Sequence, residues 1–316
     1  MNNLDINFPI DKFEELIIDI GYDSLQSWIN FWERRDKLIS FAYKYYGNNS
    51  KDDWIWGLVF PLISQAYQLN KSFSNRKLIG LSALPGTGKS TLGRLIEKLS
   101  SQLDFRISVV SIDDFYLPSK EMREVIKNNP WRVSRGFPGS HSLTLMEQKF
   151  IEWKETGKLI VPVFDKSLRG GLGDRSSWRE EYPDIVVLEG WFLGINPTKI
   201  STRFYKEVSS LISEEEFLYV QKIQKNLHGY QKIWKLIDNI WHLKPEKFKF
   251  MNNWKTQQEE EMLINKGFAL KNERLSNFLR MLNTCIPHDS FDEIKSNTKI
   301  ILNEKRQLIW VGMSNY

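Results

Sequence analysis

Hydrophobic positions recur at helical spacing through the first 75 residues, then change to short apolar runs from residue 77 onward. Phe13, Leu16, Ile17 and Ile20 share one helical face, and aromatic residues continue the period to about residue 69. We expect residues 1–75 to form an N-terminal helical extension whose aromatic stripes pack against the rest of the protein. A surface that docks a partner is the alternative interpretation of these stripes.

From residue 77 the pattern alternates between apolar strands and amphipathic helices. The expected strands are 78–83, 106–112, 159–164 and 184–189, and the expected helices between them include 89–102 and 143–156. Such alternation predicts an α/β fold of three layers, α/β/α, with a mostly parallel sheet. After residue 200 the chain is mostly helical, with further strands expected at 237–243, 299–302 and 308–311. We therefore expect two units, the extension of residues 1–75 and an α/β domain of residues 76–316 with lid and acceptor-binding insertions.

The first apolar run leads into a glycine-rich loop that opens a helix. Glycines let successive backbone N–H groups turn toward an anion, and the start of the helix adds its dipole. Lys89 can reach the β- and γ-phosphates of a nucleotide, and the Ser90 hydroxyl can bind magnesium. Ala83 stands where the strict pattern has its first glycine. The residues expected to bind a nucleoside triphosphate are Pro85, Gly86, Thr87, Gly88, Lys89, Ser90 and Thr91.

Composition narrows the class of partner. The 316 residues include 44 basic and 39 acidic side chains, a net charge of +5 that suits an anionic substrate. The basic residues form no block or aromatic-basic module typical of nucleic-acid binding, so we expect no nucleic-acid partner. A single cysteine, Cys285, excludes an internal disulfide framework. The longest apolar run is about half of a membrane span, so we expect a cytoplasmic protein with no membrane partner. The pattern leaves the oligomeric state open.

Acidic residues follow two of the expected strands. Asp113 and Asp114 come after strand 106–112, and Glu189 ends strand 184–189. Ligands of such sheets bind beyond the carboxyl ends of the strands. Asp113 is therefore a candidate general base, Asp114 a support for magnesium or for the loop, and Glu189 a magnesium-binding residue. The alternatives are a turn-capping Asp pair and a solvated Glu at the end of a strand.

Two basic, glycine-rich segments lie between these acidic residues. Turn residues in segment 135–141 bring Arg135 and His141 near one another in a plausible clamp for a carboxylate or a phosphate. Segment 165–175 carries three basic residues and three glycines, which suggests a mobile lid that closes cations over a transferring phosphoryl group. Ordinary exposed loops are the alternative for both segments.

Six short motifs follow one another along the chain. They are Ser82-Ala-x-Pro-Gly-x-Gly-Lys-Ser, Ser111-Ile-Asp-Asp-Phe-Tyr, Arg135-Gly-x-Pro-Gly-Ser-His, Val161-Pro-x-Phe-Asp-Lys-Ser, Gly173-Asp-Arg and Leu188-Glu-Gly-Trp-x-Leu-Gly. Their order resembles the D-glycerate 3-kinases of plants and cyanobacteria, which are relatives of uridine kinase, phosphoribulokinase and bacterial pantothenate kinase among the P-loop kinases. Ser142 and Lys255 depart from this pattern, where an Asp and an Arg are expected.

The resemblance implies transfer of the γ-phosphoryl group of ATP to the 3-hydroxyl of D-glycerate, a step of photorespiratory salvage, with Mg²⁺ as cofactor. It implies that Asp113 deprotonates the hydroxyl and that Ser90 and Glu189 position the metal. The other residues that we expect in the site are Lys89, Arg169 and Arg175 for catalysis, and Asp114, Tyr116, Arg135, His141 and Asp165 for binding of the substrate.

Two other functions stay open at this point. The departures at Ser142 and Lys255 suit a related kinase acting on another small hydroxylated metabolite, such as one similar to uridine or pantothenate. A nucleotide-binding regulator without catalytic activity, with the extension as its docking surface, is the alternative from another class. A pure binding protein would not need the acidic side chain of Asp113.

Overall fold

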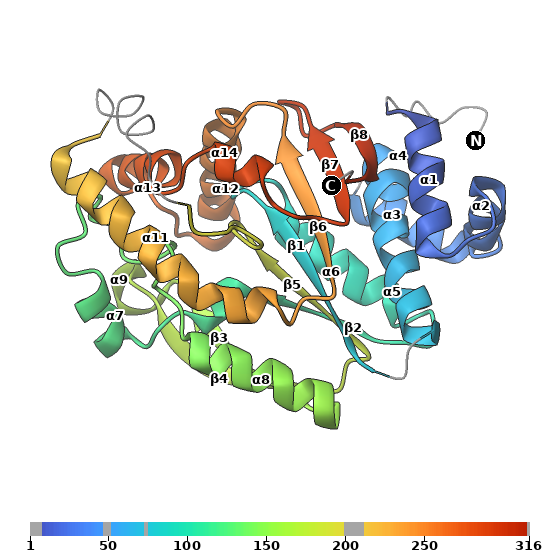
Figure 1. The fold of residues 1–316 in the computed structure, drawn as a ribbon, viewed down its shortest axis with the longest axis horizontal. Helices are drawn as coiled ribbons and strands as arrows, with labels where there is room; N and C mark the ends of the chain where they lie inside the picture. The colour runs from blue at the N-terminus through green and yellow to red at the C-terminus, as the bar shows by residue number, and fades with distance from the viewer. Residues whose placement is uncertain (1–7, 47–51, 73–74, 199–211, 315–316) are drawn as a thin grey trace.

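A six-stranded sheet in the order β2-β5-β1-β6-β7-β8 runs through the centre of the molecule (Figure 1). The computed structural model describes residues 8–46, 52–72, 75–198 and 212–314. Its first five strands are parallel, and β8 pairs antiparallel with β7 at one edge. The bounds are β1 (Lys77–Ala83), β2 (Ile107–Ser111), β5 (Ile185–Gly190), β6 (Asn239–Pro245), β7 (Thr298–Leu302) and β8 (Leu308–Met313).

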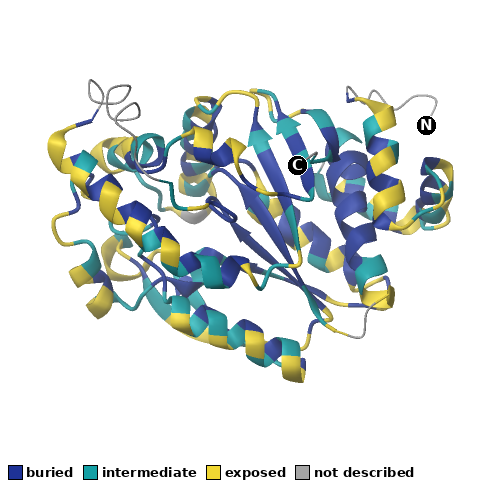
Figure 2. Ribbon diagram, in the orientation of Figure 1, coloured by how far each residue is buried: buried dark blue, intermediate teal, exposed yellow. Residues whose placement is uncertain are grey.

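Helices cover both faces of this sheet, as the alternating pattern predicts. The bounds in the α/β part are α6 (Lys89–Ser100), η2 (Ile112–Phe115), α7 (Ser119–Val125), α8 (Leu143–Thr156), α9 (Leu168–Gly171), α11 (Glu214–Trp234), α12 (Phe250–Lys266), α13 (Asn272–Thr284) and α14 (Asp289–Asp292). Every residue of β5 is buried, and the central strands appear dark blue in Figure 2. Near-continuous burial of this kind is expected of parallel strands covered on both sides.

Successive residues of the central strands contribute to two separate cores. In β1, Ile79 and Leu81 belong to one hydrophobic cluster, whereas Leu78 belongs to the other. In β5, Val187 and Leu188 divide in the same way, because neighbouring side chains of a strand point to opposite faces. The cluster that contains Leu78 also includes buried residues of α8 and α11. The three-layer α/β/α fold that the sequence predicts is confirmed.

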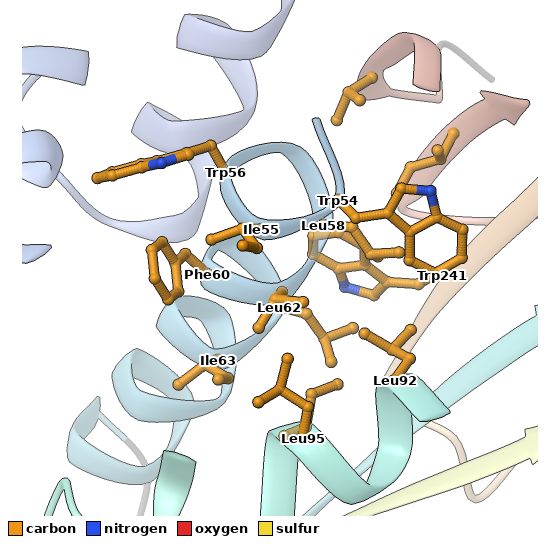
Figure 3. Packing of buried hydrophobic residues seen from close by; sticks show 14 of the residues in the cluster. Trp54, Ile55, Trp56, Leu58, Phe60, Leu62, Ile63, Leu92, Leu95 and Trp241 are labelled. Carbon is orange, nitrogen blue, oxygen red and sulfur yellow. The ribbon is translucent and has the colours of Figure 1, made fainter. Parts of the chain in front are cut away.

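The N-terminal residues are helical, as predicted, and their apolar faces enter the core on the Ile79 side of the sheet. Figure 3 shows Leu58 and Leu62 of this part of the chain lying near Leu92 and Leu95 of α6, with Trp241 of β6 close by. The bounds are α1 (Ile10–Ile20), α2 (Leu25–Glu33), α3 (Asp36–Tyr46), α4 (Asp52–Trp54), the π-helix η1 (Ile55–Val59) and α5 (Phe60–Ser72). The aromatic stripes thus pack against the α/β part of the chain.

One predicted strand lies outside the main sheet. Residues 159–164 were expected to form its third strand, but β3 (Leu159–Asp165) pairs antiparallel with β4 (Asp174–Glu181) in a sheet of two strands. Burial alternates along most of β3, and Pro162 removes one backbone donor, which suits a short two-stranded sheet better than a fully buried parallel strand. The segment 165–175 is consequently the tip of a hairpin, where α9 forms a single turn.

No helix among the described residues is long and apolar enough to cross a membrane.

Candidate active site

The parallel strands bring three chemically important segments to one edge of the sheet. β5 lies between β1 and β2, and its residue Glu189 is in register with Leu81 of β1 and Ser111 of β2. The glycine-rich loop follows β1, and Asp113 follows β2. Glu189 therefore lies between the loop and Asp113, beyond the carboxyl ends of the strands where ligands bind in such folds.

The glycine-rich loop, residues 84–88, begins with a tight turn. The Thr87 backbone N–H donates to the Leu84 carbonyl oxygen at 3.3 Å, and the Thr87 hydroxyl donates to the same oxygen at 2.6 Å. Gly86 has φ 78°, and a Cβ atom there would lie 2.4 Å from the Trp254 carbonyl carbon. Only glycine fits that position, for both its conformation and its space.

Ala83, where the strict motif has glycine, is compatible with this loop. It is the last residue of β1, is 1% exposed, and is not among the residues with positive φ. An extended residue inside a strand needs no glycine. The alanine thus leaves the turn that follows it unchanged.

Lys89 begins helix α6 and its side chain folds back over the loop. Its Nζ atom donates to the Ala83 and Leu84 carbonyl oxygens at 2.7 and 3.1 Å and lies 3.9 Å from Glu189 Oε2. Burial lowers the pKa of Lys89, while the Glu189 carboxylate opposes this effect. A triphosphate is a stronger partner for this ammonium group than two carbonyl oxygens. Within the described part of the chain, no side chain caps the start of α6 at Gly88, which suits binding of an anion there.

The same edge offers oxygen ligands that suit magnesium. Ser90 and Glu189 both line the cavity, and Glu189 is 8% exposed. Among the described residues, no group of three or more His, Cys, Asp or Glu side chains forms a metal site by itself. Magnesium in nucleotide sites is held by one or two protein oxygens together with phosphates and water. The residues present fit such a shared site, so Ser90 and Glu189 stay the candidates.

The adjacent carboxylates Asp113 and Asp114 have different surroundings. Asp114 accepts a hydrogen bond from the Ser111 N–H at 3.2 Å and so caps the short helix η2, whereas Asp113 Oδ2 pairs with Lys166 Nζ at 2.6 Å. Burial raises the pKa of Asp114 to about 6. Burial also raises the pKa of Asp113, but the Lys166 ammonium outweighs it and the net pKa is well below the usual range. This contrast favours Asp113 as the ionised base.

Tyr116 lines the cavity and lies against His141. The two rings stack with centroids 4.6 Å apart, and His141 Nδ1 lies 2.7 Å from the Tyr230 hydroxyl. Burial lowers the pKa of His141 to about 4, so the ring is neutral at physiological pH. His141 is not among the described residues that line the cavity. Its expected contact with a substrate therefore stays a prediction, and a charged clamp at His141 does not fit this geometry.

Arg135 lines the cavity and holds the hairpin tip. Its Nη1 atom donates to the carbonyl oxygens of Gly171 and Leu172 at 3.0 and 2.7 Å. The expected clamp of Arg135 with His141 is not formed, because Arg135 binds the hairpin while His141 binds Tyr230. Arg135 instead fixes the glycine-rich tip over the cavity.

The other expected residues of the tip pair within the hairpin or with its neighbours. Arg169 lies 3.6 Å from Asp174, and Arg175 Nε donates to the Tyr116 carbonyl oxygen at 3.1 Å. Asp165 lines the cavity and accepts hydrogen bonds from Ser167. Neither arginine is among the described residues that line the cavity, so their proposed role in neutralising charge stays a prediction.

Two lysines outside the set of expected site residues line this cavity. Lys166 was part of the lid segment without a role of its own, and it pairs with Asp113. Lys255 of α12 is 8% exposed and forms an ion pair with Glu259, one helical turn later. Glu259 is the first of three consecutive acidic residues, yet it is only 4% exposed. The spacing of four residues between Lys255 and Glu259 is the signal that could have revealed the pair.

The two departures from the expected pattern lie in different places. Lys255 lines the cavity, and burial lowers its pKa while Glu259 opposes this effect. Ser142 precedes helix α8, where its N–H donates to the Phe115 carbonyl oxygen at 2.8 Å, and it is not among the described lining residues. Of the two departures, Lys255 is the one that lies in the cavity.

A single cavity of 1490 Å³ joins these groups. It extends from the phosphate loop past Glu189 and Asp113 to Lys166 and Lys255. Pockets for one small ligand usually measure about 300–1,000 Å³, so this volume accommodates a nucleotide together with a small second substrate.

Known proteins resemble this chain in sequence and in fold, although no family model matches it. An uncharacterized kinase of Schizosaccharomyces pombe is 29% identical over 214 residues, which cover 61% of this chain and 74% of that protein. The chloroplastic D-glycerate 3-kinase of Arabidopsis thaliana is 31% identical over 215 residues, which cover 64% of this chain. That match spans 45% of the plant protein, less than half of its length.

A solved D-glycerate 3-kinase structure from Cryptococcus neoformans superposes with a TM-score of 0.68 at 25% identity, covering 80% of this chain and 96% of that one. The mostly parallel central sheet with helices on both faces is consistent with this similarity. The chain therefore has the fold of the P-loop kinases, its relatives include D-glycerate 3-kinases, and these similarities support an ATP-dependent small-molecule kinase.

Proposed function

We propose that this protein transfers the γ-phosphoryl group of ATP to the 3-hydroxyl of D-glycerate, forming 3-phosphoglycerate and ADP. The observation that carries the proposal is the placement of Asp113 and Lys166 across Glu189 from the phosphate loop, within one cavity. A donor site and an acceptor site that share a cavity are what a transfer reaction requires. The names of the relatives supply the identity of the acceptor.

In the proposed reaction, Asp113 accepts the proton of the acceptor hydroxyl while that oxygen attacks the γ-phosphorus. The bond between the γ-phosphorus and the bridging oxygen of ADP breaks as the new bond forms. Lys89 leaves the loop carbonyl oxygens and stabilises the negative charge on the transferring group. Magnesium at Ser90 and Glu189 would supply neutralisation of phosphate charge when bound.

The acceptor side of the cavity carries an excess of positive side chains. Lys166, Lys255 and Arg135 line it, and Asp113 and Glu259 pair with the first two. A small acid such as glycerate can bind its carboxylate to one of these cations while its hydroxyl lies at Asp113. Arg135 is the preferred partner, because its guanidinium donates hydrogen bonds to neutral groups, the carbonyl oxygens of Gly171 and Leu172 and the Ser134 hydroxyl.

Another hydroxylated metabolite is the second candidate acceptor. The observation that favours it is Lys255, which stands where an arginine is expected and is tied to Glu259. Lysine presents a compact charge and not the planar fork of arginine, so a change of acceptor shape is a physical consequence of this exchange.

An acceptor panel tests the proposal. ADP formation from ATP and Mg²⁺ is measured with D-glycerate, L-glycerate, uridine and pantothenate, and the phosphorylated product is identified by ³¹P NMR. We expect turnover with D-glycerate and its loss when EDTA removes the metal. Turnover of uridine or pantothenate without turnover of D-glycerate would contradict the acceptor and retain the kinase. Binding of ATP without any turnover would favour the nucleotide-binding regulator.

A further inference from the structure

The helical extension reaches the phosphate loop through two adjacent residues. Trp54 lines the cavity, and its ring lies 3.5 Å from the point where a Cβ atom on Gly88 would be. Trp54 is only 2% exposed, so its ring packs against Gly88 of the loop and leaves little surface for a ligand. Figure 3 shows Trp54 at the start of the π-helix η1, beside Trp241 of the sheet.

Asp53 and Trp54 both bind the turn that joins β7 to β8. The Trp54 indole N–H donates to the Arg306 carbonyl oxygen at 2.6 Å, and Asp53 accepts a hydrogen bond from the Leu308 N–H, also at 2.6 Å. Gly57 packs so tightly that a Cβ atom there would lie 3.0 Å from Leu308 and 2.9 Å from Phe8. The extension is thus closely docked on this turn.

Arg306 connects the β7–β8 turn to the phosphate loop. Its Nε atom donates to the Gly86 carbonyl oxygen at 2.9 Å, and its Nη1 atom donates to Gln257 of α12 at 2.9 Å. Arg306 itself has φ 60°, a conformation that disfavours residues other than glycine. A residue keeps such an unfavourable conformation only when its surroundings hold it in place. Here the Trp54 indole binds the Arg306 carbonyl oxygen, and the Arg306 side chain binds the Gly86 carbonyl oxygen.

The Gly86 carbonyl oxygen matters because of the peptide plane to which it belongs. In a trans peptide the carbonyl group and the next N–H point in opposite directions. Arg306 holds the Gly86 carbonyl oxygen on the side of the β7–β8 turn, so the Thr87 N–H is directed into the loop, where it donates to Leu84 at 3.3 Å. Phosphate oxygens are bound by N–H groups directed into such loops.

We propose that Trp54 and Arg306 are positioning residues for the nucleotide, through which the helical extension holds the phosphate loop in the conformation that binds ATP. The proposal rests on the proposed use of ATP and is independent of the identity of the acceptor. Loss of the Trp54 hydrogen bond loosens Arg306 and the Gly86 peptide, which weakens binding of ATP more than it slows transfer from bound ATP.

Trp54→Phe tests this link because it removes the indole N–H and keeps most of the buried ring. We expect the KM for ATP to rise about fivefold, the effect of about one hydrogen bond, with kcat and the acceptor KM changed less than twofold. The Kd for ATP, measured by calorimetry without any acceptor, should rise by the same factor.

Trp56→Phe is the matched control. Trp56 lies in the same extension, is 6% exposed, and donates its indole N–H to the Tyr43 hydroxyl at 3.1 Å, away from the loop. The two variants should lose similar thermal stability, but only Trp54→Phe should weaken binding of ATP. Equal effects of both variants on the Kd for ATP, or no effect of Trp54→Phe, would overturn the proposal.

Arg306 gives a second measurement that does not depend on the tryptophan. Arg306→Gln should raise the Kd for ATP about tenfold, and Arg306→Lys should restore part of the loss because it keeps one cationic donor. Equal Kd values for the wild type and Arg306→Gln would overturn the proposal. If the wild type binds ATP and phosphorylates no acceptor, the proposed function fails, while the difference between the Trp54 and Trp56 variants still decides this inference.

Discussion

The proposed donor half and the proposed acceptor half of the cavity are built in different ways. The donor half is the phosphate loop with the start of α6, a continuous stretch whose glycines, lysine and serine follow one another in the sequence. The acceptor half combines Asp113 after β2, Lys166 in the β3–β4 hairpin and Lys255 on α12, which are far apart in the sequence. One half is a local motif, whereas the other is a product of tertiary structure.

The two halves also differ in how their charges are balanced. Lys89 rests on backbone carbonyl oxygens and is 3.9 Å from Glu189, so a triphosphate can take it over without breaking a close ion pair. Asp113 and Lys255 each have a close partner of opposite charge. An acceptor must rearrange those pairs to bind. The donor half can therefore bind its ligand without breaking a close ion pair. The acceptor half favours ligands whose charged groups replace the ion pairs that binding breaks.

Asp113→Asn gives the largest effect that we expect, and it acts on the acceptor half alone. The amide keeps the shape of the side chain but does not accept the hydroxyl proton, so kcat should fall about 10²–10⁴-fold. The Kd for ATP, measured by calorimetry, should stay within about twofold of the wild type, because Asp113 does not contact the loop. A variant that loses ATP binding together with kcat would show that the two halves are not separable.

Lys89→Ala is the counterpart in the donor half. It removes the cation that stabilises the transferring group, so we expect kcat/KM for ATP to fall about 10²–10³-fold. Lys98→Ala, an exposed lysine on the same helix, is the control and should retain full activity. Steady-state kinetics with a saturating acceptor measure both variants. A similar loss in the two variants would mean that the charge of α6, and not the position of Lys89, is responsible.

The difference between the halves also explains what the sequence could predict. The strand–loop–helix motif at residues 77–92 and the acidic strand ends depend on local pattern and on parallel topology, which the sequence carries. The ion pair of Lys166 with Asp113 depends on which distant segments meet. Burial of Glu259 follows from α12 packing near Leu270, whose N–H donates to its carboxylate at 2.7 Å, and nothing in the local acidic run indicates it.

The β3–β4 hairpin is the part of the fold where the sequence held a usable signal that the prediction did not use. Pro162 interrupts the apolar run of β3, and burial alternates along most of that strand, unlike the uniformly buried β5. Proline in a strand indicates an edge or a small sheet. Giving weight to that residue would have separated residues 159–164 from the parallel sheet and placed Lys166 at a hairpin tip.

Lys166→Met should change the pH dependence of the reaction. Asp113 must be ionised to accept a proton, and in the wild type Lys166 holds its pKa well below the usual range. Without Lys166, burial raises the pKa of Asp113, so the acidic limb of kcat should move to higher pH and the loss should grow as the pH falls. A profile of kcat from pH 5 to 9 measures the shift.

Lys158→Met is the control for that profile. Lys158 precedes the same hairpin and pairs with Glu180 at 3.0 Å on the surface, away from the cavity. Its variant should keep the profile of the wild type. An unchanged acidic limb in Lys166→Met would show that Lys166 binds the acceptor without setting the ionisation of Asp113.

Asp114→Asn gives the smallest effect, on stability, and it separates the roles of the two adjacent carboxylates. Burial raises the pKa of Asp114 to about 6, above its usual 3.8, so the folded protein disfavours the ionised form. Below about pH 3, under both pKa values, the carboxyl is protonated whether or not the chain is folded, and the variant should match the wild type. Above pH 6 the ionised carboxylate destabilises the fold.

The asparagine oxygen can still accept the hydrogen bond from the Ser111 N–H, so the variant should be more stable by about 1–2 kcal/mol at pH 8. Chemical denaturation at pH 3 and pH 8 measures the difference. A variant less stable than the wild type at pH 8 would contradict this expectation. It would mean that nearby cations stabilise the ionised Asp114 carboxylate by more than its burial costs, so that Asp114 is a partner of the cations around Asp113.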